Sequence, residues 1–175
     1  MTRPAPGDPY PFSRGDVASM CGVGVPTIKN LIVGKVLPKR RRGTGNHHGF
    51  DMDDAVRILL SKRLLHVGLQ VRSIQSLFDS FESPPSKPWA WLRTPEARAS
   101  GAALVLVLGH PMGPDPAHTG RAYLTTAAEA VEWLKSKRSV ICIDVNALIA
   151  QIEERTGQPY EAQPAERTVS RDEQQ

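Results

Sequence analysis

Hydrophobic residues at helical spacing open the sequence and predict two short helices. Ser13 is a good N-cap, the apolar positions after it recur three and four residues apart, and Gly22 ends this first stretch. A second stretch opens at Val25-Pro26-Thr27, with proline in the first turn where a helix tolerates it, and Gly34 ends it. Two short helices joined by a tight turn at a glycine form the core of a helix-turn-helix.

The next segment changes from apolar periodicity to a run of basic residues. Lys39-Arg40-Arg41-Arg42 leads into a Gly-Thr-Gly turn and then to Phe50, which predicts a β-hairpin with a basic first strand. Asp51 then caps a long helix that Gly68 breaks. A fourth helix follows, marked by Val71, Ile74, Leu77 and Phe78.

Strand-like hydrophobic runs occur in the second half of the chain. The strands are predicted over 103–108, 122–124 and 139–145, and the helices after Thr125 or Thr126 and over 146–155. Trp89 and Trp91 are expected to pack onto this core. A module of about 70 residues is marginal in size on its own, so a core shared between two copies is expected.

Proline and polar residues divide the chain into two predicted units. Residues 1–11 hold four prolines and 158–175 are polar, so both ends are predicted to be disordered. The proline-rich segment 83–88 cannot continue a helix and is predicted to be an extended linker. The predicted fold class is therefore α+β: a winged helix-turn-helix of four helices and a hairpin over 12–82, followed by a small α+β module over 89–157.

Composition and charge narrow the function classes. No stretch approaches the roughly 18 apolar residues of a membrane span, and the N-terminus lacks the build of a signal peptide. The two cysteines, Cys21 and Cys142, lie far apart, which favours a reducing cytoplasm over a disulfide framework. Residues 12–82 carry 11 Lys or Arg against 6 Asp or Glu, whereas 84–157 carry 8 against 7. Positive charge gathered in one segment is typical of a module that binds a polyanion.

The ordered elements of residues 12–78 resemble the DNA-binding domain of the MerR family. The similar stretches are FSRGDVASMCGVGVPTIKNLI and LPKRRRGTGNHHGFDMDDAVRILLSKRLLHVGLQVRSIQSLF. The resemblance implies a regulator that places its second helix in the major groove of DNA and its hairpin wing on flanking phosphates. The sequence departs from the family pattern in two ways. His47-His48 stands where the wing usually carries a Tyr-Arg pair, and a proline-rich segment stands where a long dimerising helix usually follows.

Side-chain chemistry supports these roles. Asn30 and Lys29 can reach base edges, and Thr27 can meet a methyl group or a phosphate. A helix N-terminus can bind a phosphate, so Ser13 and Arg14, at the start of the first predicted helix, are also expected to contact DNA. The predicted DNA contacts are Ser13, Arg14, Thr27, Lys29, Asn30, Lys39, Arg40, Arg41, Arg42, Thr44, Asn46, His47 and His48.

The sequence therefore predicts a transcriptional regulator, and a repressor rather than an activator, that binds an inverted repeat as a homodimer through residues 89–157. It is expected in the cytoplasm, on the nucleoid. The alternative is an architectural protein similar to phage excisionases or terminase small subunits. Neither a catalytic group nor a cofactor or metal site is predicted, because His110, Asp115 and His118 fit a surface loop and adjacent His47 and His48 point to opposite faces of a strand.

Replacing Arg40, Arg41 and Arg42 together with alanine should weaken binding to every DNA duplex. Phosphate contacts add affinity without reading sequence, so the dependence of log Kd on log salt should flatten by about one for each phosphate that the protein no longer neutralises. Fluorescence anisotropy across a salt series measures both quantities. Unchanged affinity would remove the wing from the DNA-binding surface.

Overall fold

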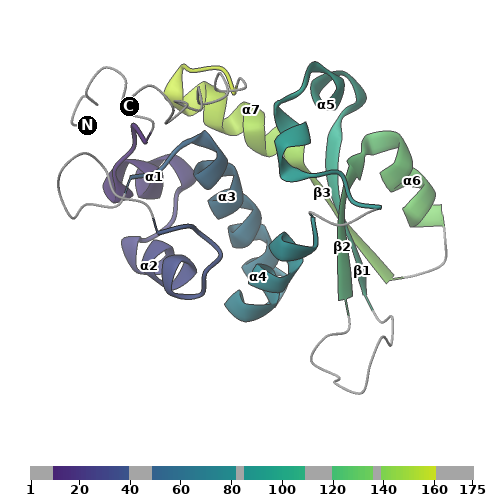
Figure 1. Cartoon of the computed structure of the whole chain (residues 1–175), viewed down its shortest axis with the longest axis horizontal. Helices are drawn as coiled ribbons and strands as arrows, with labels where there is room; N and C mark the ends of the chain where they lie inside the picture. The colour runs from purple at the N-terminus through teal and green to yellow at the C-terminus, as the bar shows by residue number, and fades with distance from the viewer. Residues whose placement is uncertain (1–9, 40–48, 82–84, 109–119, 136–138, 161–175) are drawn as a thin grey trace, which may run out of the picture.

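Seven α-helices, one 3-10 helix and one antiparallel sheet of three strands make up the residues that the computed structural model describes, namely 10–39, 49–81, 85–108, 120–135 and 139–160. This confirms the mixed α+β class expected from the sequence. The helices of the first half gather on one side and the sheet lies on the other (Figure 1). None of the described helices is long and apolar enough to cross a membrane.

The first two helices begin and end where their caps predict. Helix α1 (Arg14–Cys21) starts with a capping box in which the Asp16 N–H donates to Ser13 Oγ at 3.2 Å and the Ser13 N–H donates to Asp16 Oδ2 at 2.9 Å. It ends at Gly22, which adopts the left-handed conformation with φ +58°. Helix α2 (Val25–Val33) follows two residues later, with its proline in the first turn.

Helices α3 (Met52–His66) and α4 (Val71–Ser80) also match the predicted positions. A second capping box starts α3, in which the buried Asp51 and Asp54 accept hydrogen bonds from each other's backbone N–H. Just before it, Phe50 forms an antiparallel bridge with Phe12. The rest of the predicted wing, residues 40–48, lies outside the described residues, so the hairpin stays a prediction.

The sheet has the strand order β2-β1-β3 and is antiparallel throughout. Strand β1 (Ala102–Leu108) is central, flanked by β2 (Gly120–Thr126) and β3 (Ser139–Asp144). All three strands expected from the hydrophobic runs are present. Each predicted helix of this half is also present, as α6 (Ala127–Lys135) and α7 (Val145–Thr156).

Residues 89–100 form two elements that the sequence did not predict. Trp89–Arg93 is a 3-10 helix, and α5 (Pro95–Ser100) follows with Thr94 as its N-cap. Trp89 and Trp91 are buried, as expected. Trp89 joins an aromatic cluster with Phe78 and Phe81, whose rings lie 5.7 and 6.1 Å from its own.

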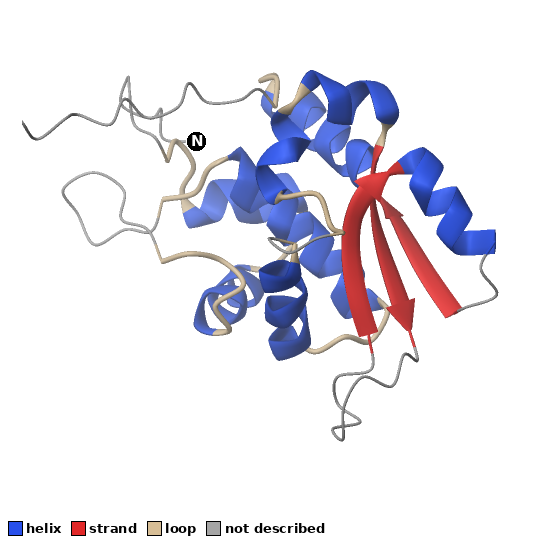
Figure 2. Cartoon of the chain, turned by 45° about the vertical axis from the view of Figure 1, so that its right-hand side comes forward, coloured by secondary structure: helices blue, strands red, loops and turns tan. Residues whose placement is uncertain are grey.

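The two faces of the sheet bury different clusters because side chains alternate along each strand. Leu104 and Leu106 of β1 face the helices of the first half and belong to the main core. Val105 and Val107 face the opposite side and pack with Ala130 of α6. Figure 2 shows the sheet between these helices and α6, so the sheet forms the middle layer of this end of the molecule.

One buried cluster extends through both predicted units, from Phe12 to Tyr160. Helix α7 packs against α3 and α1, although the sequence separates them by about half the chain (Figure 1). Arg155 of α7 donates a hydrogen bond to the Met20 carbonyl of α1. Residues 12–82 and 89–157 therefore share a core within one chain. Sharing of this kind gives a module of about 70 residues the apolar partners that it lacks alone.

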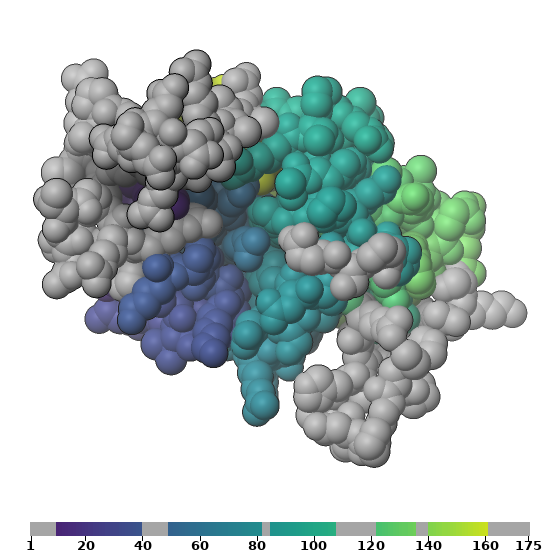
Figure 3. All heavy atoms as spheres, viewed as in Figure 1, coloured from purple at the N-terminus to yellow at the C-terminus, as the bar shows by residue number. Residues whose placement is uncertain are grey.

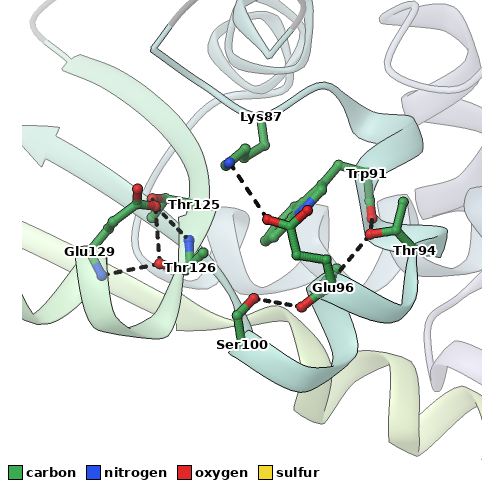
Figure 4. A network of polar contacts seen from close by, with 9 residues as sticks. Lys87, Trp91, Thr94, Glu96, Ser100, Thr125, Thr126 and Glu129 are labelled. Carbon is green, nitrogen blue, oxygen red and sulfur yellow. Dashed lines mark hydrogen bonds and ion pairs between the residues drawn. The ribbon is translucent and has the colours of Figure 1, made fainter.

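The end of the proline-rich segment lies along the sheet. The Lys87 N–H donates to the Leu124 carbonyl at 2.8 Å, and the Leu124 N–H donates to Ser86 Oγ at 2.9 Å. Lys87 Nζ also lies 3.9 Å from Glu96 of α5 (Figure 4). Residues 86–87 thus cover part of the outer edge of β2, whereas 82–84 lie outside the described residues.

Three side chains join the C-terminal segment to α3. The Tyr160 hydroxyl and the Arg93 guanidinium both donate to the Asp53 carboxylate, in the first turn of α3. The Tyr160 side chain is 1% exposed. The sequence placed residues 158 onward in a disordered tail, and the structure corrects this at Tyr160, because a buried aromatic ring gains more from the core than the polar residues around it lose. Residues 161–175 lie outside the described part.

Replacing Tyr160 with Phe should change how stability depends on alkaline pH. Burial, and then the nearby Asp53 carboxylate, raise the pKa of Tyr160 above its ordinary value of 10.0. Folding therefore holds the phenol proton more tightly, so this stabilisation is full below pH 10 and is lost as pH rises. In the Phe variant the free energy of unfolding should be about 1–2 kcal/mol lower at pH 7 and fall less above pH 10.

Chemical denaturation at a series of pH values measures this difference. Tyr123→Phe is the matched control, because Tyr123 stacks on Trp133 at 4.9 Å on the other face of the sheet. That variant should keep the alkaline loss of stability seen in the unmodified chain. An equal loss in the Tyr160 variant would contradict the role given to the buried phenol.

Candidate nucleic-acid interface

Helix α2 presents one buried and one exposed face. Ile28 and Leu31 are fully buried and hold the helix against α1 and the core. Lys29 and Asn30 are exposed, and Val33 is 82% exposed, which is unusual for a large apolar side chain. Figure 3 shows the surface of α2 and of the turn after it beside that of α4.

A basic groove lies on one side of α2 and has a volume of about 650 Å³. We call it the first groove. Four of its eight lining residues carry a positive charge and the other four are apolar, so the charge of the groove favours an anion. The lining residues are Arg14, Lys29, Ile32, Val33, Lys35, Leu37, Pro38 and Lys39.

A second groove of about 540 Å³ separates the end of α2 from the start of α4. Val33 and Lys35 line both grooves, so the end of α2 forms the ridge between them. The second groove also contains two cations and two amides. Its lining residues are Asn30, Val33, Gly34, Lys35, Val71, Arg72 and Gln75.

The charge of this surface has one sign. Five different cations line the two grooves, and no Asp or Glu is among the described residues that line either of them. Like charges that remain together at a solvent-exposed surface repel one another, and a polyanion removes that repulsion. The charge of the surface around α2 thus suits an anionic partner such as a phosphate backbone.

The turn after α2 fixes the position of Lys35. Its φ of +59° is the one left-handed conformation recorded for a residue other than glycine in the described ranges. The Lys35 N–H donates to the Ile32 carbonyl at 3.1 Å, and the Val36 N–H to the Leu31 carbonyl at 2.9 Å. Val36 is buried directly after it. These contacts hold the backbone of Lys35 between the grooves in a conformation that costs about 1 kcal/mol.

The structure brings together four of the predicted DNA contacts. Arg14, Lys29 and Lys39 line the first groove, and Asn30 lines the second. Thr27 lies half-buried in the first turn of α2. The other predicted residues of the wing lie outside the described part of the chain: Arg40, Arg41, Arg42, Thr44, Asn46, His47 and His48.

Ser13 caps α1, as the sequence predicted, and this cap competes with the phosphate contact that was also expected of it. Its hydroxyl oxygen accepts the Asp16 N–H, and the Asp16 carboxylate accepts the Ser13 N–H. This carboxylate already supplies negative charge at the N-terminus of α1, where a phosphate was expected. The start of α1 is thus a poorer anion site than the sequence suggested.

Two cations of the grooves were missed in the sequence, Lys35 and Arg72. Lys35 directly follows the glycine that ends α2, and such a residue looks like an ordinary turn residue. Arg72 belongs to α4, and only the packing of α4 beside α2 brings it to the second groove. The sequence signal that could have indicated Arg72 is its position in the first turn of the fourth predicted helix, which follows the predicted wing and the long helix.

The described residues give little support for a metal site or for a cysteine nucleophile. No group of three His, Cys, Asp or Glu side chains there could hold a metal ion. Burial raises the pKa of Cys21 to about 12, against the opposing effects of Arg155 and Lys62, so this thiol is a poor nucleophile at neutral pH. The loop with His110, Asp115 and His118 lies outside the described residues.

No protein-family model matches the chain, and no curated protein is significantly similar to it in sequence. The geometry and charge of the α2 surface, together with the basic composition of residues 12–82, are therefore the features that indicate a function.

Replacing Gly34 with Ala should disturb the ridge between the grooves. A Cβ at this position would lie 2.3 Å from Val71 Cγ1 and 3.2 Å from the Asn30 carbonyl oxygen, so the Val71 side chain would have to turn or α4 would have to move away from α2. We expect a loss of about 1–3 kcal/mol in the free energy of unfolding, as in other overpacked sites. Thermal and urea denaturation measure this loss.

Gly15→Ala is the matched control. Gly15 lies in α1 with its nearest contact at 3.8 Å, and alanine is favoured over glycine inside helices by about 0.5–1 kcal/mol. The control should therefore be equal to or more stable than the unmodified chain. Equal stability of the Gly34 variant would show that α4 does not depend on this close approach.

Proposed function

We propose that this protein binds double-stranded DNA with the exposed face of α2. The observation that carries the proposal is the set of five cations, without a lining carboxylate, around the two grooves that flank α2. Helix α2 has nine residues and is about 13 Å long, and the major groove of B-DNA, about 12 Å wide, admits an α-helix.

Different residues of this face would have different tasks. Lys29 and Asn30 project from α2 and suit hydrogen bonds to base edges, and Val33 suits contact with a thymine methyl group. Arg14, Lys35, Lys39 and Arg72 lie on both sides of the helix, which suits the two phosphate strands that border a major groove. The wing residues predicted from the sequence would extend this basic surface.

We further propose that the protein is a transcriptional repressor that acts on the nucleoid as a homodimer on an inverted repeat. Two copies related by a two-fold axis would place two α2 helices on two half-sites and double the phosphate contacts. The architectural role, similar to excisionases or terminase small subunits, is the competing hypothesis. Selection of bound duplexes from a random pool separates the two, because an inverted repeat supports repression and direct repeats support assembly.

Replacing Lys35 and Arg72 together with alanine should weaken binding to selected and unrelated duplexes by a similar factor. Removal of two phosphate-binding cations should lower the salt slope by about two. Asn30→Ala should instead change the preferred site, with a penalty of about 1–3 kcal/mol at the matched base pair and little effect on unrelated DNA. Anisotropy titrations at several salt concentrations measure both effects.

Lys87→Ala is the matched control. Lys87 lies beside β2 and lines neither groove, and its side-chain contact with Glu96 at 3.9 Å is an exposed ion pair that contributes little to stability. This variant should bind DNA as the unmodified chain does. Equal effects of the control and of the groove variants would refute the assignment of the α2 surface.

A further inference from the structure

The two outer edges of the sheet are treated differently. At the outer edge of β2, the Leu124 carbonyl accepts the Lys87 N–H and the Leu124 N–H donates to Ser86 Oγ, as described above. Strand β3 pairs with β1 on its inner side, and on its outer side no described residue forms a backbone hydrogen bond with it. Figure 2 shows β3 as the strand furthest from α1 and α2. An edge with unpaired N–H and C=O groups is a template for another strand.

Side chains of β3 are also less covered than those of its neighbour. Val105 and Leu106 of β1 are almost completely buried, whereas Ile141 and Ile143 of β3 are half-buried and Cys142 is exposed. Ile141 and Ile143 pack against the main core from one side and remain open on the other. The strand thus has the apolar composition of an inner strand and the exposure of an edge.

Helix α6 adds exposed apolar side chains near this edge. Trp133 stacks on Tyr123 of β2 with ring centroids 4.9 Å apart, which turns that flank of α6 toward β2. Val131 lies about 160° around the helix axis from Trp133, so the flank with Val131 and Leu134 is turned toward β3. These two side chains are 48% and 53% exposed.

We propose that the outer edge of β3 pairs antiparallel with β3 of a second copy of this chain, giving one continuous six-stranded sheet. This names the contact of the homodimer proposed above, but pairing itself requires no DNA. The occupant follows from charge. Helix α6 ends at Lys135, which forms an exposed ion pair with Glu132, and β3 begins at Ser139 and ends at Asp144. Antiparallel pairing sets the Lys135 end of each copy toward Asp144 of the other, where the exposed lysine can exchange a weak ion pair for one between the copies.

Symmetry restricts the register. A two-fold axis perpendicular to the sheet places α6 of both copies on the same face of the six-stranded sheet. Residues that oppose each other in the two β3 strands must then point to the same face, which leaves two registers, one centred on Ile141 and one centred on Cys142. In the register centred on Cys142, the two Cys142 residues face each other directly, with Cα atoms about 5 Å apart. In the register centred on Ile141, the two Cys142 residues are diagonal neighbours, about 7–8 Å apart.

The test compares molar mass in solution for surface variants. Light scattering should give twice the 19.2 kDa chain mass for the unmodified protein and the single mass for Cys142→Lys and Leu134→Lys. A lysine on the edge strand, or on α6 beside it, would oppose the contact between copies. Both sites are exposed within one copy, so circular dichroism should remain unchanged. Val67→Lys, at a position 45% exposed beside α3, is the control that should stay dimeric.

Cross-linking at Cys142 gives an independent readout. A short bismaleimide should join two copies through Cys142, and a spontaneous disulfide should form only in the register centred on that residue. Cys21 is buried and serves as an internal control that does not react. A monomeric unmodified protein, dimeric lysine variants or absence of the cross-link would overturn the proposal. If the unmodified chain dimerises through β3 but does not bind DNA, the proposed function is refuted and the pairing through β3 stands.

Discussion

The Asp53 carboxylate is the point at which distant parts of the chain meet. Arg93, from the 3-10 helix, and Tyr160, from the C-terminal segment, both donate to it, and Asp53 itself starts α3. A half-buried carboxylate requires such donors, since an unpaired charge at this depth would be costly. The same contact ties the 3-10 helix and the segment after α7 to α3, which packs against α1 and α4. The position of the basic surface therefore depends on residues far from it in sequence.

Local signals account for what could be predicted from the sequence. Ser13 and Asp51 cap helices, and Gly22 ends one, through contacts within a few residues, so the sequence alone places α1 and α3. Tyr160 and Arg72 owe their roles to partners far away along the chain, which no periodicity reveals. The 3-10 helix at Trp89–Arg93 follows a proline-rich stretch that resembles a linker, and its burial comes from Phe78 and Phe81.

In the candidate site, too, some residues could be predicted from local sequence signals and others could not. Lys29 and Asn30 could be chosen from the sequence because Ile28 and Leu31 define the buried face of α2, and the remaining positions must point outward. Lys35 could not, because its direction depends on a left-handed turn that the sequence marks only by the preceding glycine. Charge composition indicated which segment would suit a polyanion, and packing determined which of its described cations lie together.

The difference between the two sheet edges limits how many copies can join. Residues 86–87 occupy the outer edge of β2 at Leu124, so a pair joined through β3 would present two outer edges that are each interrupted at that residue. An interrupted edge favours closure at two copies, whereas a sheet with both edges free can grow into a fibre. Residues 86–87, at first sight a connection between elements, would then act as the terminator of assembly.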